Sequence, residues 1–465
     1  MKIKVKNLGA LKQAEFTLGN LTIICGGNNT GKTYATYALF GFLSSWREIL
    51  EIKIDVDNLS QLLAEGVTLI DIQQYVDQAE QIVSKASEMY SRQLFNVFAA
   101  PAERFADSEF QIYLDTEKIN LGQKFERTMR TANNAELFSL TKSAGSTELF
   151  ITLLAEKEQI KIPNEILNHI IADAIKDIVF AQIIPNPFIA SSERTGAAIF
   201  RKDLDFDRHR ILEEIGKADK KIDRVELFQK DYDRDYALPI KKNVEFIRDL
   251  RFQSVSKKSS FILKEHPDVL NDFADIIGGA YTITANDELF YVPKGKKVKL
   301  SIDESSSAVR SLLDIGFYLR HEAQKGDLLM IDEPELNLHP ENQRRVARLF
   351  SRLVNLGIKI FITTHSDYIV KELNTLITLK GNKPHLKRIA DEEGYQKEEL
   401  ISADQIKVYI AEEKLIKLDG NQKKTKCQTL TPANINPEMG IEARSFDITI
   451  DTMNRIQDAI FWGED

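Results

Sequence analysis

A short glycine-rich segment near the N-terminus restricts the fold of this chain more than any other feature of its sequence. Residues 26–33 read GGNNTGKT, after the apolar run LTIIC and before the helix-like run TYATYALFGFL. The spacing Gly26-x-x-x-x-Gly31-Lys32-Thr33 is that of a phosphate-binding loop, in which glycines let successive main-chain N–H groups face one anion. A Gly/Asn-rich surface turn is the alternative, but it leaves both flanking patterns unexplained. The segment therefore predicts a strand, a phosphate-binding loop and a helix in succession.

Each loop position has an expected role in nucleotide binding. Lys32 is expected to reach the β- and γ-phosphates, and the Thr33 hydroxyl is expected to bind Mg²⁺. The N-terminal end of the following helix adds positive potential for the phosphates. The residues expected to contact ATP here are Gly26, Gly27, Asn28, Asn29, Thr30, Gly31, Lys32 and Thr33. The predicted ligands are therefore ATP and Mg²⁺.

A second motif, GDLLMIDEPELNLHP, occupies residues 326–340. Its apolar run predicts a buried parallel strand that ends on Asp332 and Glu333, at the sheet edge where ligands bind in open α/β folds. Asp332 is therefore expected to hold Mg²⁺, and Glu333 to orient or deprotonate an attacking water. The alternative is an acidic loop that only caps the helix at 340–350.

A third apolar run, 358–363, predicts another buried strand and is followed by His365. At the same sheet edge His365 could bond the γ-phosphate or the water near Glu333. A lone histidine is more often structural, and that reading remains open.

In this order, GGNNTGKT, IDEPELNLHP and FITTHSDYI resemble the motifs of ABC-type ATPases of the SMC, RecF and OLD (overcoming lysogenization defect) group. The resemblance extends to 297–322, where that group carries its signature motif at the start of a helix. It implies that Ser306 contacts ATP held by a second subunit, although Ala308 replaces the glycine of the group's Ser-x-Gly. The local alternative is a serine that caps the helix. The implied assembly is a homo-oligomer, a dimer or a multiple of dimers, joined by ATP.

The segment SSERTGAA at 191–198 resembles a Ser/Ala-Glu-Arg motif of relatives that act in phage defence. Glu193 and Arg194 could therefore lie near the nucleotide, and a surface ion pair is the alternative. The whole plan resembles the ATPase subunits of two-gene anti-phage systems of the PARIS and Septu kind. It implies an ATP-hydrolysing sensor or regulator that controls a separate effector, such as a nuclease or toxin. The alternative function is a RecF- or SMC-like ATPase acting on DNA in repair or recombination.

The expected fold class is α/β, a P-loop ABC-type ATPase core with helical insertions and a small α+β C-terminal extension. The expected parts are core at 1–48, an inserted helical or mixed lobe at 49–180, a return to the core at 181–204, a short charged helical insertion at 205–268, core at 269–380 and the extension at 381–465.

Periodicity gives the expected elements inside these parts. In the first insertion, apolar residues that include Ile70 and Ile72 recur at helical spacing. In the second insertion, the spacing of apolar residues predicts a short antiparallel helix pair; these residues are Leu212, Ile215, Ile222, Val225 and Phe228. In the extension we expect a strand at 440–447 and a closing helix at 446–465. Phe461 and Trp462 at its end are expected to be a packed terminus, and a contact with a partner is the alternative.

Charge and composition limit the choice of partners and compartment. No stretch reaches ~18 apolar residues, and the N-terminus alternates like a strand, so we expect a cytoplasmic protein with no membrane partner. Two cysteines fit a reducing compartment. Lysine-rich stretches at 255–260, 292–299 and 420–426 make nucleic acid a possible partner. The formal net charge of -8 and the lack of nearby aromatic residues do not favour it.

Overall fold

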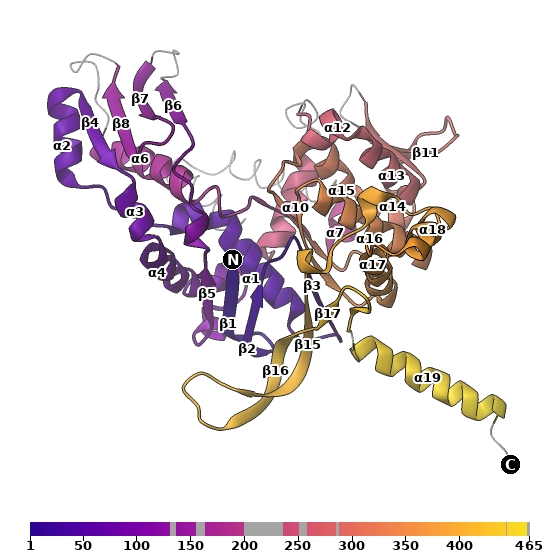
Figure 1. Cartoon of the computed structure of the whole chain (residues 1–465). Coiled ribbons are helices and arrows are strands. Elements are labelled where there is room, and N and C mark those ends of the chain that lie inside the picture. Colours follow the sequence, from indigo (N-terminus) through magenta and orange to yellow (C-terminus); the bar gives the residue numbers. More distant parts are fainter. Residues whose placement is uncertain are drawn as a thin grey trace, which may run out of the picture. The chain divides into compact units, whose positions relative to one another are not determined.

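The computed structural model describes residues 1–130, 136–154, 163–199, 236–250, 258–284, 288–442 and 444–462, and the side chains of the last range from residue 452. Figure 1 shows the chain, which divides into two compact units. Unit 1 contains Met1–Ile3, Phe42–Arg92 and Phe110–Pro185, and unit 2 contains Lys4–Gly41, Gln93–Glu109 and Asn186–Asp465. The five apolar positions that predict a helix pair, from 212 to 228, lie outside the described residues.

Unit 2 is built on a six-stranded sheet with the order β16-β15-β3-β14-β13-β9. The strands are β3 (Leu21–Gly26), β9 (Pro187–Ala190), β13 (Leu328–Asp332), β14 (Lys359–Thr364), β15 (Ile406–Lys417) and β16 (Lys424–Pro432). Neighbours from β9 to β15 are parallel, and only the β15–β16 pair in this sheet is antiparallel. The predicted strands at 328–331 and 358–363 are confirmed.

The central strands β3 and β13 are buried along their whole length. Strands covered on both faces have continuous apolar sequences, which explains the runs LTIIC and LLMID. Parallel pairing aligns Ile331 with Ile362 and Ile362 with Ile23 in one apolar row. The carboxyl ends of β3, β14 and β13 therefore lie side by side, and the three motifs begin there.

Helices and small strands complete unit 2. Helix α1 (Lys32–Ile49) follows the glycine-rich loop and belongs to unit 2 up to Gly41 and to unit 1 from Phe42. Helix α14 (Ser307–Ser311) begins at the predicted signature position, as expected from the sequence. The other helices are α5 (Leu94–Phe98), α7 (Arg194–Ile199), α10 (Leu238–Asp249), α12 (Phe261–Glu265), α13 (Pro267–Ile277), α15 (Leu313–Phe317), the π-helix η4 (Tyr318–Glu322), α16 (Pro340–Asn355), α17 (Asp367–Leu379), α18 (Pro384–Glu392) and α19 (Arg444–Trp462). The remaining strands and turns are β1 (Lys2–Leu8), β2 (Leu11–Thr17), β10 (Gly279–Ile283), β11 (Leu289–Pro293), β12 (Leu300–Ser301), β17 (Ile435–Asn436), β18 (Gly440–Ile441), η1 (Ala102–Phe105), η5 (Lys397–Glu399) and η6 (Ala403–Gln405).

Unit 1 contains an antiparallel sheet with the order β4-β8-β7-β6. Its elements are α2 (Val56–Glu65), β4 (Val67–Asp71), α3 (Gln73–Asp77), α4 (Ala79–Ser91), β5 (Glu109–Tyr113), η2 (Thr116–Lys118), β6 (Phe125–Arg130), β7 (Glu136–Lys142), β8 (Glu148–Leu153) and α6 (Asn164–Val179). The prediction that Ile70 lies on a helix is wrong, because Gly66 at φ 79° ends α2 and the chain continues as strand β4.

Two expectations for the last residues are also wrong, while the closing helix is confirmed as α19. The predicted strand at 440–447 is limited to Gly440–Ile441, since the helical spacing of apolar residues already begins at Phe446. Phe461 and Trp462 do not pack, because 75% and 81% of their surfaces are exposed. No helix within the described ranges has the length and apolar content needed to cross a membrane.

Candidate functional site

The glycine-rich loop joins β3 to α1, and its backbone explains its composition. Gly26 and Gly31 have φ of 144° and 93°, values that residues with a Cβ rarely adopt. A Cβ on Gly31 would lie 2.7 Å from Leu11 Cγ, and one on Gly26 would lie 2.5 Å from the Ala411 carbonyl oxygen. Glycine is therefore required at both positions. Between them, Gly27, Asn28 and Asn29 are exposed, and the hydroxyl of half-buried Thr30 donates to the Gly27 carbonyl at 2.9 Å.

The ammonium group of Lys32 lies inside this loop. Its Nζ donates to the carbonyl oxygens of Gly26 at 3.1 Å and Gly27 at 2.7 Å. Burial lowers the pKa of Lys32, while the nearby carboxylates of Glu333 and Asp332 raise it. The carboxylates favour the charged form of Lys32, and a cation held on the loop is suited to bind an anionic ligand there.

Asp332, the last residue of β13, is 1% exposed and accepts hydrogen bonds from two threonines. Thr33 Oγ1 donates to Oδ2 at 3.2 Å, and Thr363 Oγ1 donates to Oδ1. Burial raises the pKa of Asp332, and the bond from Thr363 opposes that change. The structure thus brings the two predicted Mg²⁺ ligands, Thr33 and Asp332, together, and both offer the oxygen atoms that Mg²⁺ prefers.

Glu333 follows directly and has left-handed backbone geometry, with φ of 54°. Its N–H lies 3.2 Å from both the carbonyl oxygen and Oγ1 of Thr363. Its Oε1 lies 3.3 Å from His365 Nε2, and each of the two side chains is 28% exposed. Burial lowers the pKa of His365, as does the nearby Lys32 charge, so the imidazole is mainly neutral at pH 7. Glu333 and His365 thus place a carboxylate and a neutral imidazole side by side, partly exposed to solvent.

A further carboxylate, Glu335, fixes the His365 loop and was not singled out from the sequence. Glu335 accepts from the His365 N–H at 2.6 Å and from Thr364 Oγ1 at 2.9 Å. Burial raises the pKa of Glu335. The signal that could have identified Glu335 is the third acidic residue of IDEPE, after Asp332 and Glu333.

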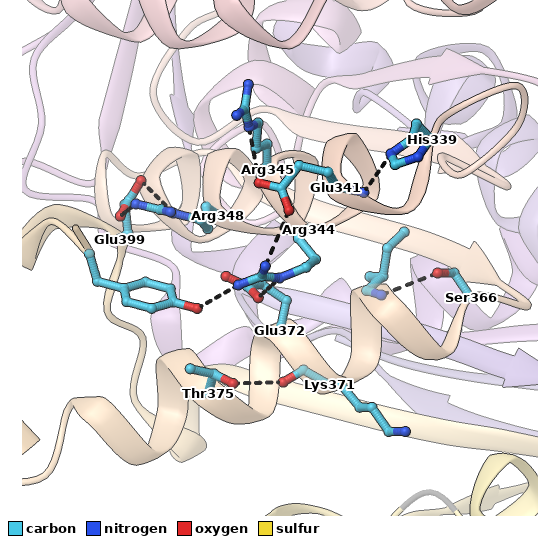
Figure 2. A network of polar contacts seen from close by, with 12 residues as sticks. His339, Glu341, Arg344, Arg345, Arg348, Ser366, Lys371, Glu372, Thr375 and Glu399 are labelled. Carbon is cyan, nitrogen blue, oxygen red and sulfur yellow. Dashed lines mark hydrogen bonds and ion pairs between the residues drawn. The ribbon is translucent and has the colours of Figure 1, made fainter. Parts of the chain in front are cut away.

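The two helices that follow these motifs, α16 and α17, are joined by the polar network in Figure 2. Arg344 of α16 donates to Glu372 of α17 at 2.7 Å, and Ser366 donates to Gln343 at 2.5 Å. Ser366 also accepts from the Ile369 N–H and so caps α17. Because α16 follows the Glu333 segment and α17 follows His365, the network fixes both sides of the site.

Ser306 lies on a different element, as the N-cap of α14. Its Oγ accepts from the Val309 N–H at 3.4 Å, and Ser306 itself is exposed, while Ala308 is half-buried. The structure brings the loop residues, Asp332, Glu333 and His365 together, and it places Ser306 at a separate helix terminus.

The segment SSERTG follows β9, next to β13 in the sheet. Glu193 accepts from the Tyr37 hydroxyl at 2.9 Å and is near enough to Asp332 to raise its pKa. Arg194 is 1% exposed, so the alternative of a surface ion pair is wrong for this residue. The local sequence around Arg194 does not predict that its side chain is buried.

Comparison with known proteins gives the family. The model of the family described as the AAA ATPase domain matches residues 1–370, and the chain belongs to this family. Membership and the parallel sheet confirm the α/β P-loop class predicted from the sequence, and they identify the chain as a nucleotide-binding ATPase. No curated protein matches the sequence.

Three solved head domains of SMC proteins are similar to this chain at low identity and low TM-score. An SMC head bound to the C-terminal winged-helix domain of ScpA is 14% identical, with 92% of this chain and 97% of that chain covered and a TM-score of 0.32. A Pyrococcus furiosus SMC head with an extended coiled coil, bound to the C-terminal domain of ScpA, is 13% identical, with 98% of both chains covered and a TM-score of 0.30. The Thermotoga maritima SMC head is 9% identical, with 93% and 98% covered and a TM-score of 0.31.

Proposed function

We propose that this chain is an Mg²⁺-dependent ATPase of the ABC type that hydrolyses ATP to ADP and phosphate. One observation carries the proposal: Asp332 accepts a hydrogen bond from Thr33 of the phosphate-binding loop, while the adjacent Glu333 lies 3.3 Å from His365. Phosphoryl transfer to water needs a metal ligand and a general base next to the bound phosphates. Asp332 and Glu333 provide these two groups on consecutive residues beside the loop.

Each group has a defined part in this reaction. The loop N–H groups and Lys32 would bind the phosphates, and Thr33 with Asp332 would hold Mg²⁺, which supplies positive charge to the phosphate oxygens. Glu333 would accept the proton of the attacking water. His365, neutral and held by Glu335 at its main chain, would orient that water or bond the γ-phosphate.

The proposal includes an assembly in which ATP joins two subunits. The motif resemblance implies that the signature serine of one subunit completes the ATP site of another. Ser306 supports this because it is exposed at the start of α14, so its hydroxyl is available to a facing molecule. The working form is then a dimer or a multiple of dimers.

The resemblance to ATPase subunits of two-gene anti-phage systems supports the finer part of the proposal. In this mechanism, ATP binding and hydrolysis change the geometry of the joined subunits. A separate nuclease or toxin is bound in one geometry and released in the other. We place this activity in the cytoplasm, where two cysteines without a disulfide are expected.

A RecF- or SMC-like ATPase acting on DNA is the second candidate, and the placement of several lysines favours it. The loop between β11 and β12 exposes Lys294, Lys296, Lys297 and Lys299, and the turn between β15 and β16 exposes Lys423. Exposed lysines of this kind can contact nucleic-acid phosphates. Lys294 is already paired with Asp275 at 2.5 Å, which reduces the free positive charge of the first loop.

One experiment separates the two candidates. The chain with Glu333→Gln is purified from its host with ATP, together with the product of the neighbouring gene, and the mass of the complex is measured. The defence proposal predicts a multi-subunit complex that contains the second protein and releases it when ATP is removed. A complex without that protein, together with ATP-dependent retention of duplex DNA, would instead support the second candidate.

A further inference from the structure

The guanidinium of Arg194 is buried beside the candidate site and bonds to main-chain oxygen atoms from three separate segments. Nη1 donates to the carbonyl of Asp332 at 2.6 Å, and Nη2 donates to that of Glu333 at 2.8 Å. Nη1 also donates to Ser191 at 2.8 Å, and Nε donates to Ser311 at 2.7 Å. One rigid side chain therefore connects the segment after β9, the end of β13 and the end of α14.

The bonds to Asp332 and Glu333 act on a backbone that needs support. Glu333 has a positive φ, which a residue with a Cβ adopts at a cost unless its surroundings maintain it. The Glu333 N–H is held by Thr363 on one side, and Arg194 holds the carbonyl groups of Asp332 and Glu333 on the other. The direction in which the Glu333 carboxylate points thus depends on Arg194.

The bond to Ser311 connects the same side chain to the signature helix. Ser311 is the last residue of α14, and Ser306 is its N-cap. Because the guanidinium is planar and its donors have fixed relative directions, a shift of α14 changes the geometry of the bonds to the Glu333 segment.

We propose that Arg194 is a positioning residue for ATP hydrolysis, which orients Glu333 and couples that orientation to the Ser306–Ser311 helix. The inference rests on the proposed ATPase function and deepens it. It gives a physical route by which contact of Ser306 with ATP on a second subunit changes the rate at Glu333.

A competing explanation is that Arg194 only neutralises a buried carboxylate. Asp314 is 1% exposed, and neither of its carboxylate oxygen atoms has a hydrogen-bond partner in the described part of the chain. Burial raises the pKa of Asp314 to about 7, and the Arg194 charge opposes this rise. Loss of Arg194 alone could therefore destabilise the fold, so the test must remove both charges.

The test compares Arg194→Met with the double variant Arg194→Met/Asp314→Asn. For each protein kcat, KM for ATP, ATP affinity and Tm are measured. We expect the double variant to recover Tm relative to the single variant, with ATP affinity within about threefold of wild type. We expect kcat to stay about 100-fold low in both, the size of effect known for small misplacements of reacting groups. Recovery of wild-type kcat in the double variant would show that Arg194 is only a counter-charge.

Arg352→Met is the matched control. Arg352 is also buried, at 7% exposed, and it lies in the last turn of α16, where it pairs with Asp268 and Asp272 rather than with any residue of the site motifs. We expect this variant to lose stability but to keep kcat per folded molecule. A wild-type chain that does not hydrolyse ATP would contradict the proposed function, whereas an active wild type with an equally active Arg194→Met would contradict this inference alone.

The coupling to α14 has its own test, a double-mutant cycle between Arg194→Met and Ser306→Arg. If both act through Glu333, the combined variant is within about threefold of the slower single variant, because interacting positions are not additive. A combined loss equal to the product of the two separate losses would contradict the coupling.

Discussion

Replacement of Glu333 by glutamine separates catalysis from binding in this protein. The amide can still hydrogen-bond a water but cannot take its proton, so loss of the general base should reduce kcat by about 100- to 10,000-fold. This corresponds to about 3–5 kcal/mol of activation barrier at ~1.4 kcal/mol per tenfold change. The lost pair with His365 spans 3.3 Å between side chains that are each 28% exposed, so it should change the free energy of unfolding by at most about 1 kcal/mol.

The assay is phosphate release under saturating Mg²⁺-ATP, together with equilibrium binding of ATP and thermal unfolding. Glu341→Gln is a suitable control, because Glu341 is another carboxylate of the same segment that pairs with Arg344 and Arg345 at the surface. We expect Glu333→Gln to bind ATP, unfold near the wild-type temperature and hydrolyse very slowly, while the control hydrolyses normally. A wild-type kcat in Glu333→Gln would refute the role of this carboxylate as the base.

Three more predictions follow from the same geometry. Ser306→Arg should slow hydrolysis more than it weakens ATP binding, and Lys32→Ala should be inactive, but a mixture of the two should regain part of the phosphate release, because one composite site is then intact. No recovery would count against shared sites. Because burial raises the pKa of Asp314 to about 7, the folded chain holds a proton that the unfolded chain releases above about pH 4, and stability falls as pH rises from about 4 to 7. Asp314→Asn should therefore raise Tm more at pH 8 than at pH 5, and an equal change at both would contradict this. The purified chain should hydrolyse ATP slowly and leave DNA and RNA intact, and nuclease activity lost on mutating a residue outside the ATP site would reveal an effector within the chain.

The central sheet was predictable from the sequence because its strands are buried on both faces. The run LLMI has no polar residue and LTIIC has only Thr22, so neither alternates as a half-exposed strand would, and the glycine-rich loop and the acidic pair Asp332–Glu333 follow these runs directly. Asp332 and His365 could therefore be assigned to one sheet edge without knowledge of the strand order. That β15 pairs in parallel with β3 could not be foreseen, since a strand sequence does not identify its neighbour.

Contacts between segments that are distant in the chain could not be predicted from the sequence. Arg194 donates hydrogen bonds to Ser311 and Glu333, each more than a hundred residues away in the chain. From the sequence of SSERTG alone, a surface ion pair and a position near the nucleotide are equally consistent. Ile70 was assigned to a helix because apolar spacing near Gly66 suits both a helix and a strand. The exposed end of α19 shows that an apolar face in the sequence does not ensure a partner within the same chain.

The central claim is that ATP is hydrolysed where the phosphate-binding loop meets Asp332 and Glu333, and phosphate release by the purified wild-type chain tests it most directly. The rate is measured with Mg²⁺-ATP, with ATP and a chelator, and with Lys32→Ala in place of the wild type. The account predicts turnover only in the first case, with a Tm for Lys32→Ala close to that of the wild type. Equal turnover by folded Lys32→Ala, or turnover that is unchanged by the chelator, would contradict it.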